Sequence, residues 1–382
     1  MLHWGLALLT LASPRAGPDS SLVATIPFDL YDGRINIRAA VNGDSTWLVL
    51  DTGAPHTALD RAWARQRGAR LLASNDSTHA RVDSLQLAGI ALRDYRVNLY
   101  DFTQVDDAAG RFQGGVLGGD FLRQYTLEVD YPGRVVRLYD RDRYRYDGTG
   151  AQIPFLEAKG VPAVAGQVVL ADEVVPARLL LDTGNGHFCL ILMTRFVDRH
   201  NVHTRIGRTI GGPLVTGIDG PVRVAVGTLP ALRVGAMSLD SFPVALGREH
   251  AGVVAARRVD GLIGGAVFRG GRLVLDYARS RAFIEPGDTP AASCRYDESG
   301  LTLSATGPTY EHVHVEYVVP GSPAAEAGLE PGDELFGIDD HASTNLTLPE
   351  VRRLLSAAGP RRLRVGRGAD TTWVRLDLRP LF

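Results

Sequence analysis

The sequence predicts a mainly β protein with two similar halves and a small C-terminal module that contains strands and a helix. Three observations lead to this prediction. The 43 glycines among 382 residues indicate many turns. Four short motifs of the first half recur in the same order in the second half. After residue 287 the composition changes, and the length exceeds that of a usual single domain.

Composition and charge narrow the classes of protein to which the chain can belong. With 45% hydrophobic and 22% charged residues, it is typical of a soluble globular protein. The net charge is −2 and the basic residues are scattered, which argues against a nucleic-acid partner. No segment is long and apolar enough to predict a membrane span.

Residues 1–20 are a possible signal peptide. An apolar run over residues 6–9 is followed by small residues around Ala12, where a signal peptidase cleaves, although no Lys or Arg precedes the run. A cleaved signal places the protein in the bacterial periplasm or outside the cell. An uncleaved start places it in the cytoplasm.

Residues 146–286, the second half, repeat motifs of residues 21–145, the first half. The repeated pairs are Ile26-Pro27-Phe28 with Ile153-Pro154-Phe155, Asp51-Thr52-Gly53 with Asp182-Thr183-Gly184, Val116-Leu117-Gly118-Gly119 with Leu262-Ile263-Gly264-Gly265, and Leu127-Glu128-Val129-Asp130-Tyr131 with Leu273-Val274-Leu275-Asp276-Tyr277. Four matches in one order predict a repeated fold. The second copy is about 15 residues longer, and the turn-rich residues 206–226 are the expected place of the insertion.

Short strand-like segments dominate each copy. Residues 35–41 alternate between apolar and polar, Asn42-Gly43 indicates a tight hairpin, and residues 47–50 read as a buried strand. Only residues 59–67 and the stretch after Gly118 read as short helices. Many short strands at regular spacing predict a closed or sandwich β fold.

In each copy an apolar strand leads into Asp-Thr-Gly, and an apolar-apolar-Gly segment follows later. This combination resembles the retropepsin-like aspartic peptidases, here fused in tandem over roughly residues 22–286. The resemblance implies a pseudo-twofold pair of β-barrel lobes in one chain, the bilobal architecture of pepsin-like enzymes. Because one chain then builds the whole site, we expect a monomer.

Asp51 and Asp182 are the predicted catalytic pair. Two adjacent carboxylates cannot both ionise easily, so the pair holds one proton, and one member can accept a proton from water while the other donates one. This chemistry needs neither a metal nor another cofactor. The resemblance assigns Thr52 and Thr183 to a reciprocal hydrogen-bond network below the two loops. Supporting positions where a side chain would obstruct close packing are Gly53, Gly184, Gly118 and Gly264.

Other polar residues near the repeats are expected to have supporting roles. His56 and His187 flank the two loops, and packing or loop hydrogen bonding is the favoured interpretation because this mechanism requires no histidine. The repeated Asp130 and Asp276 are expected to be structural. Ala54 follows the first triplet but Asn185 follows the second, and we hypothesise that Asn185 donates a hydrogen bond to the neighbouring carboxylate and makes the two aspartates inequivalent.

The hairpin that closes over substrate in such enzymes, the flap, is expected in the second half. The first half has only the polar residues 73–80 at that position, whereas the second has a glycine-rich segment at residues 209–222. Its glycines would provide hinge freedom. They are Gly211, Gly212, Gly217 and Gly220.

The two cysteines, Cys189 and Cys294, have neither metal-ligand spacing nor a disulfide framework. Cys189 lies in an apolar run, which favours a buried, inert thiol. A single bridge between them stays open as an alternative.

After a linker at residues 287–296, residues 297–382 contain Val318-Val319-Pro320-Gly321-Ser322-Pro323-Ala324-Ala325-Glu326-Ala327-Gly328-Leu329 followed by Pro331-Gly332-Asp333-Glu334-Leu335. These segments resemble the signature of bacterial-type PDZ domains, which are α/β sandwiches. The resemblance implies a helix over residues 346–355 and final strands over residues 361–378. It also implies that Ser299, Gly300 and Leu301 capture a peptide C-terminus. A PDZ module that only packs on the rest of the chain is the alternative.

Taken together, these features predict an aspartic-type endopeptidase that acts on peptides or proteins, with a PDZ module that recruits or gates substrate. One alternative is a non-catalytic peptide-binding or scaffold protein with the same fold. Two intact Asp-Thr-Gly triplets argue against it, because such a protein has no need for Asp51 or Asp182. Another alternative is a metal-independent hydrolase of non-peptide amides.

Overall fold

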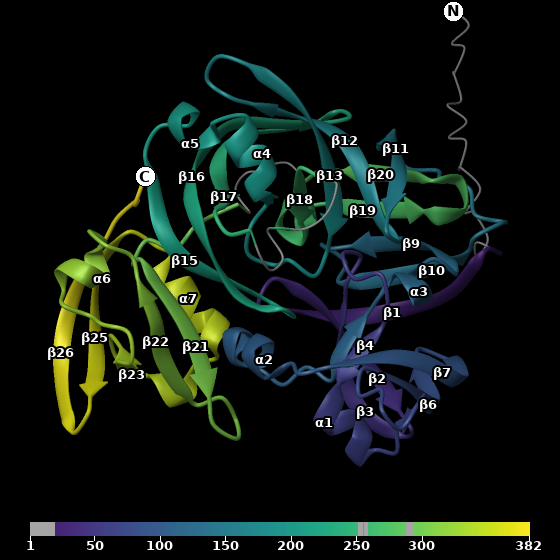
Figure 1. The fold of residues 1–382 in the computed structure, drawn as a ribbon, viewed down its shortest axis with the longest axis horizontal. Coiled ribbons are helices and arrows are strands. Elements are labelled where there is room, and N and C mark those ends of the chain that lie inside the picture. The colour runs from purple at the N-terminus through teal and green to yellow at the C-terminus, as the bar shows by residue number, and fades with distance from the viewer. Residues whose placement is uncertain (1–19, 251–254, 256–258, 288–293) are drawn as a thin grey trace, which may run out of the picture.

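The computed structural model describes residues 20–250, 255, 259–287 and 294–382. Nearly all of the predicted signal peptide and most of the predicted linker lie outside the described residues. Strands dominate throughout, and a module with its own sheet forms the C-terminal end (Figure 1). The prediction of a mainly β protein is therefore confirmed.

Six strands of the first half close into a ring. In the order β2, β3, β8, β4, β7 and β6, each strand pairs with the next, and β6 pairs back with β2. The β3–β8 and β4–β7 pairs are parallel. The strands of this half are β1 (Leu22–Tyr31), β2 (Arg34–Val41), β3 (Asp44–Leu50), β4 (Ala58–Asp60), β5 (Arg70–Leu71), β6 (His79–Leu87), β7 (Ile90–Tyr100), β8 (Gly115–Leu117), β9 (Tyr125–Asp130) and β10 (Val135–Asp140).

The second half contains a ring with the same arrangement. In the order β12, β13, β18, β14, β17 and β16, each strand pairs with the next, and β16 pairs back with β12. Again two pairs, β13–β18 and β14–β17, are parallel. The strands are β11 (Ala151–Ala158), β12 (Val161–Val169), β13 (Val174–Asp182), β14 (Leu190–Leu192), β15 (Thr209–Gly217), β16 (Gly220–Val234), β17 (Met237–Gly247), β18 (Gly261–Gly264), β19 (Arg272–Asp276) and β20 (Arg281–Glu285).

A third, antiparallel sheet joins the halves. Its strand order is β1, β10, β9, β19, β20 and β11, so three strands come from each half. The junction is the β9–β19 pair, in which buried Leu127 lies opposite buried Leu275. Because backbone pairing and a shared apolar core both cross this junction, the two halves are fixed to each other at this sheet.

Short helices connect the strands of the two halves. They are α1 (Arg61–Gln66), α2 (Thr103–Ala109), α3 (Gly119–Leu122), α4 (Thr194–Arg199) and α5 (Val202–Arg205). The sequence predicts α1 and α3, and both are present. It does not predict α2, α4 and α5.

The C-terminal module has its own sheet and core. Strands β21 to β23, β25 and β26 pair in chain order, and β24 pairs with β23. The predicted helix and final strands are confirmed. The elements are β21 (Leu301–Thr306), β22 (His312–Val318), α6 (Pro323–Glu326), β23 (Glu334–Ile338), β24 (His341–Ala342), α7 (Leu348–Leu355), β25 (Gly359–Arg367) and β26 (Asp370–Leu378).

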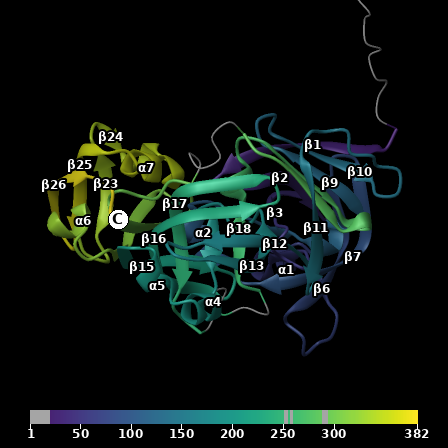
Figure 2. The ribbon, with the colours of Figure 1, turned by 90° about the horizontal axis from the view of Figure 1, so that it is seen from above.

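A disulfide joins this module to the second half. Cys189, just before β14, is bonded to Cys294, and their Cα atoms are 5.5 Å apart. The favoured expectation of a free thiol at Cys189 is therefore wrong, and the bridge left open by the sequence is present. The cysteines are 105 positions apart and no local signal marks them as a pair, so only the fold brings them together. The module lies at one end of the molecule, beside β15 and β16 (Figure 2).

Candidate active site

The two Asp-Thr-Gly triplets lie at equivalent points of the two rings. Asp51 directly follows β3, and Asp182 is the last residue of β13. Each of these strands is apolar, is buried near its end, and runs parallel to a neighbour, β8 or β18. Burial of the strands fixes where they end, so the polar triplets emerge at the centre of the molecule, where both aspartates remain partly exposed.

Backbone N–H groups hold both carboxylates in the same way. The amides of Gly53 and Ala54 donate to Asp51 Oδ1 at 2.8 and 3.0 Å. The amides of Gly184 and Asn185 donate to Asp182 Oδ1 at 2.9 and 3.2 Å. Since one oxygen of each carboxyl group is bound to its own loop, the other is free to face the partner aspartate and a substrate.

The two threonines form a reciprocal network below the carboxylates. The Thr52 amide donates to Thr183 Oγ1 at 3.1 Å, and the Thr183 amide donates to Thr52 Oγ1 at 3.0 Å. Each hydroxyl in turn donates to the opposite strand, Thr52 to the carbonyl of Leu181 and Thr183 to that of Leu50. Both side chains are fully buried, so these four bonds fix the two loops relative to each other.

The glycines of the triplets allow the loops to approach closely. A Cβ at Gly53 would lie 2.6 Å from Asp182 Cγ, and one at Gly184 would lie 2.5 Å from Asp51 Cγ. Gly118 and Gly264 lie against the backbone of the same loops, next to the carbonyls of His56 and Phe188. A side chain at any of these four positions would therefore move one of the two Asp-Thr-Gly loops.

The environment makes the two aspartates a coupled acid pair. Burial raises the pKa of Asp51, and it raises the pKa of Asp182 well above the usual value, to which the charge of Asp51 adds. Together these effects favour a state in which the pair shares a single proton.

Asn185 donates its hydrogen bond to Asp182 through the backbone amide and not through its side chain. Its side-chain amide donates to the Phe188 carbonyl at 3.1 Å, and its Oδ1 accepts from the amides of His187 and Phe188. The turn itself engages the side chain, as asparagine commonly does, and the carboxylate of Asp182 receives the backbone N–H instead. The backbone amide of Asn185 therefore binds Asp182 in the same way as the amide of Ala54 binds Asp51.

The two flanking histidines bind carboxylates. His56 lies 3.9 Å from Asp120, and His187 Nε2 is 3.0 Å from Asp32 Oδ2. Asp32 is buried and also accepts a hydrogen bond from Arg352 of the PDZ domain at 2.6 Å. Burial works to raise the pKa of Asp32, but the charges of His187 and Arg352 outweigh it and hold this pKa well below its usual range.

The repeated strand-end aspartates stabilise turns and ion pairs. Asp130 accepts a hydrogen bond from the Gly133 amide, and Asp276 accepts one from the Arg279 amide. The buried carboxylate of Asp276 also pairs with Arg281 at 2.8 Å. These contacts agree with a structural function.

The predicted flap residues form a hairpin, β15–β16. Gly217 and Gly220 pair with each other and enclose a tight turn with Ile218 at its tip. Gly211 and Gly212 lie at an irregularity of β15, where the hydroxyl of Tyr317 in the PDZ domain donates to the Gly211 carbonyl at 3.3 Å. The hairpin also contacts α2 of the first half, so it touches all three parts of the chain.

The predicted carboxylate-binding loop of the PDZ domain is already bonded to an aspartate. The Ser299 hydroxyl donates to Asp297 Oδ1 at 2.7 Å, the Gly300 amide donates to Asp297 Oδ2 at 2.5 Å, and the Leu301 amide donates to the Ser299 hydroxyl. Burial raises the pKa of Asp297 to about 6. The sequence reasoning overlooked Asp297, although it lies two residues before Ser299.

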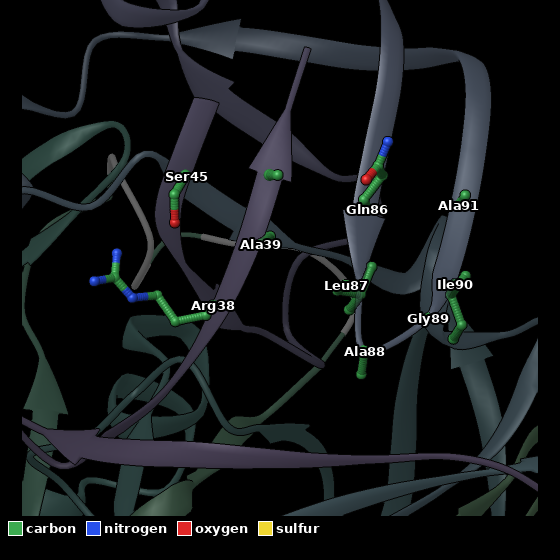
Figure 3. A pocket seen from close by; sticks show the side chains of 10 residues that line it. Arg38, Ala39, Ser45, Gln86, Leu87, Ala88, Gly89, Ile90 and Ala91 are labelled. Atoms are coloured by element: carbon green, nitrogen blue, oxygen red, sulfur yellow. The ribbon is translucent and has the colours of Figure 1, made fainter. Parts of the chain in front are cut away.

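Sequence reasoning also misses Asp32, Tyr317 and Arg352, which connect the PDZ domain to the other two parts. Each is joined to a residue more than 100 positions away, so no local pattern could identify them. A hollow of about 310 Å³ between β2, β3, β6 and β7 is lined mainly by backbone and small side chains, and neither aspartate borders it (Figure 3).

In the described ranges of the chain, no three His, Cys, Asp or Glu side chains are grouped as metal ligands would be. Every helix in these ranges is too short or too polar to span a lipid bilayer.

Comparison with known proteins supports both resemblances. A family model described as "Aspartyl protease" matches residues 37–121, and one described as "PDZ domain" matches residues 314–366. None of the curated proteins matches the chain.

Three solved structures align with parts of the chain. The photosystem II D1 C-terminal processing protease is 25% identical over 22% of this chain and 24% of its own, with a TM-score of 0.21. The PDZ domain of HtrA3, bound to a phage-derived ligand, is 20% identical over 22% of this chain and 85% of its own, with a TM-score of 0.20. The aspartic proteinase from Irpex lacteus is 11% identical over 71% of this chain and 99% of its own, with a TM-score of 0.42. From the family models, the chain contains an aspartyl protease segment that includes Asp51 and, near its C-terminus, a PDZ domain.

Proposed function

We propose that this protein is an aspartic endopeptidase whose catalytic pair is Asp51 and Asp182, one from each of two tandem lobes. The observation that carries the proposal is the close approach of the two Asp-Thr-Gly loops, which the Thr52–Thr183 network joins and in which each triplet glycine lies against the opposite aspartate. A carboxyl pair that is partly exposed yet has raised pKa values is suited to acid–base catalysis near neutral or mildly acidic pH.

The reaction is hydrolysis by an activated water. The pair holds one proton; we assign it to Asp182 and the role of base to Asp51. Asp51 accepts a proton from water as the water oxygen bonds to the scissile carbonyl carbon, and Asp182 donates its proton to the carbonyl oxygen. Collapse of the resulting diol breaks the C–N bond: the amine leaves with the proton that Asp51 accepted, and one hydroxyl of the diol returns a proton to Asp182. The residues balance the protons without an acyl-enzyme.

The substrate is an extended peptide that lies between the two lobes, below the β15–β16 hairpin. This hairpin extends from a ring of the second lobe and contacts the first, which supports its assignment as the flap. Since a single chain supplies both aspartates, the active form is a monomer.

The location that fits best is an oxidising compartment, the periplasm or the cell exterior. The Cys189–Cys294 disulfide supports this, because such bonds persist where thiols are not kept reduced. Cell fractionation with the native N-terminus tests it, and recovery of the full-length protein in the cytoplasm with reduced cysteines contradicts it.

The decisive experiment is cleavage of a diverse peptide library from pH 3 to 8 with and without a statine-type inhibitor. Wild type, Asp51→Asn and Asp182→Asn are compared, with Asp340→Asn as the matched control because that side chain is 93% exposed on the PDZ domain. We expect cleavage by wild type and Asp340→Asn, inhibition by the statine, and a loss of at least about a thousandfold in both site variants.

Each other outcome has a distinct meaning. A folded wild type that binds the statine compound but cleaves nothing at any pH identifies a peptide-binding protein instead. Cleavage retained by both site variants removes Asp51 and Asp182 from the mechanism.

A further inference from the structure

The PDZ groove offers the clearest relation between the peptidase and its C-terminal domain. We define this groove as the space between the edge strand β21, helix α7 and the loop Asp297–Leu301. In PDZ domains an extended peptide pairs with the edge strand, and backbone N–H groups at the end of the groove bind its C-terminal carboxylate. In this protein, groups of the same chain fill each of these positions.

The end of the groove already holds a carboxylate. Asp297 accepts hydrogen bonds from the Ser299 hydroxyl and the Gly300 amide, which belong to the loop expected to capture a peptide C-terminus. Ser299 is fully buried. The loop is therefore satisfied without an external ligand.

Arg352 of α7 occupies the edge of β21. Its Nη2 donates to the Leu303 carbonyl of β21 at 2.9 Å and to the Ala108 carbonyl of α2 at 2.6 Å, and its Nη1 donates to Asp32 Oδ1 at 2.6 Å. Two of its three partners belong to the first half of the peptidase. One guanidinium thus joins the PDZ edge strand to the first lobe.

Helix α2 of the first half lies beside β21, the strand that borders the groove (Figure 1). The backbone of Gly110, at its C-terminal end, is so close to α7 that a Cβ there would lie 2.6 Å from Leu348 Cβ. The hydroxyl of Tyr31 donates to the Gly110 carbonyl at 2.8 Å and holds this end of the helix in the first half. The end of α2 therefore covers the part of the groove where side chains of a ligand would bind.

The PDZ domain is fixed to the second half on its other side. The Cys189–Cys294 bond joins the two covalently. Val319 and Leu381 of the C-terminal region belong to the same buried cluster as Ile210 and Val222 of the β15–β16 hairpin. The PDZ domain is thus fixed to the second half and also contacts α2 of the first half. Through these two contacts it connects the two halves of the peptidase.

We propose that the PDZ domain is an intramolecular latch. Its groove holds helix α2 through the hydrogen bonds of Arg352, and this contact opposes separation of the two lobes. The proposal rests on the proposed endopeptidase function and identifies its regulation as gating. An extended peptide that pairs with β21 must displace Arg352 and α2, so binding of such a peptide and the latched state exclude each other.

The test compares Arg352→Met with Arg353→Met. Arg353 is the exposed neighbour on the same helix, which makes it the matched control. Hydrogen exchange of the amides at residues 103–110 reports the α2 contact. Cleavage of an unfolded protein and of a fluorogenic octapeptide reports access to the site. Thermal unfolding checks that the variants fold. If Arg352→Met does not fold, Arg352→Lys replaces it, because lysine keeps the charge but cannot bridge three acceptors.

In Arg352→Met we expect exchange at residues 103–110 to rise on the order of tenfold, because charge-assisted hydrogen bonds to the helix end are lost. Cleavage of the unfolded protein rises several-fold, whereas cleavage of the octapeptide changes by less than about twofold, since the short substrate needs little opening. Arg353→Met behaves as wild type in both assays.

Two results overturn the latch. One is wild-type exchange at residues 103–110 in a folded Arg352 variant. The other is faster hydrogen exchange at residues 103–110 while the cleavage rate of the unfolded protein, relative to that of the octapeptide, stays as in wild type. If neither the wild type nor any variant cleaves a substrate, the proposed peptidase function fails, while the exchange data still decide whether Arg352 holds α2 in the groove.

Discussion

At the scale of single residues, the proposed catalytic pair has equivalent geometry at its two aspartates. Each aspartate receives two backbone N–H bonds at one oxygen, and residues 54 and 185 supply equivalent amides although their side chains differ. Burial raises the pKa of both aspartates, and the charge of Asp51 adds to this effect at Asp182. The equivalent amides explain why an Asn in one loop and an Ala in the other are compatible with one site.

The raised pKa of Asp182 leads to a prediction about stability. A carboxyl group whose pKa is raised by folding stabilises the folded state at pH values below the unfolded pKa, and this stability is lost as the pH rises through the folded pKa. The Asp182→Asn variant has no carboxyl group to ionise at this position, so it does not lose this stability as the pH rises. We expect the variant to equal wild type near pH 3.5 and to exceed it in thermal unfolding temperature at pH 7 to 8. Asp340→Asn, at an exposed carboxylate, should show no such pH dependence. A difference that is constant from pH 3.5 to 8 contradicts the raised pKa.

At the scale of elements, the β15–β16 hairpin differs most between the two halves. The first half has the two-residue strand β5 at the corresponding place, while β15 contains nine residues and pairs with β16 almost to its tip. The tip presents Ile218, an apolar side chain that is 40% exposed. An apolar residue at the end of a polar turn suits contact with a substrate.

Ile218→Ser tests this function of the tip. Removing the apolar contact should lower kcat/KM for peptides by about 1–2 kcal/mol of transition-state binding, or roughly 5- to 30-fold. Leu156→Ser is the control, because Leu156 is 67% exposed on β11 and should leave kcat/KM unchanged. Steady-state kinetics with one fluorogenic peptide measure both. Equal values for the two variants would remove the hairpin tip from the substrate site.

At the scale of the whole molecule, three parts are joined at different strengths. The central antiparallel sheet and a continuous core hold the two halves together, and the disulfide with the shared cluster around Ile210 holds the PDZ domain to the second half. The contact of the PDZ domain with the first half depends chiefly on Arg352 and the end of α2. Of the three connections, this polar one is the easiest to open, which is why a gate is expected there.

The disulfide prediction belongs to this scale. Closing a loop of 105 residues should stabilise the fold by about 4–5 kcal/mol through the entropy of the unfolded chain. We expect the double variant Cys189→Ala and Cys294→Ala to lose stability of this order in denaturant unfolding. Wild type treated with a thiol reductant should lose a similar amount, and the reductant should not affect the double variant. Unchanged stability in the double variant would show that the bond contributes nothing.

The sequence by itself determined the class of fold, the two Asp-Thr-Gly loops and the PDZ domain, because these depend on local patterns. Neighbouring residues are enough to recognise each of these features. The examples are the apolar strands before Asp51 and Asp182, the Asn42-Gly43 turn between β2 and β3, and the PDZ segment around Pro331-Gly332-Asp333. Helix α2 was not predicted, because its buried residues are Asp106 and Ala109, which form no apolar pattern at helical spacing.

Only the tertiary structure decided which distant groups meet. The Cys189–Cys294 bond, the orientation of the Asn185 side chain towards Phe188, and the bridge from Arg352 to Asp32 and Ala108 each depend on how elements far apart in the chain are packed or on how one turn is closed. Such contacts arise from burial and hydrogen bonding summed over the whole fold, so no single segment contains the information that specifies them.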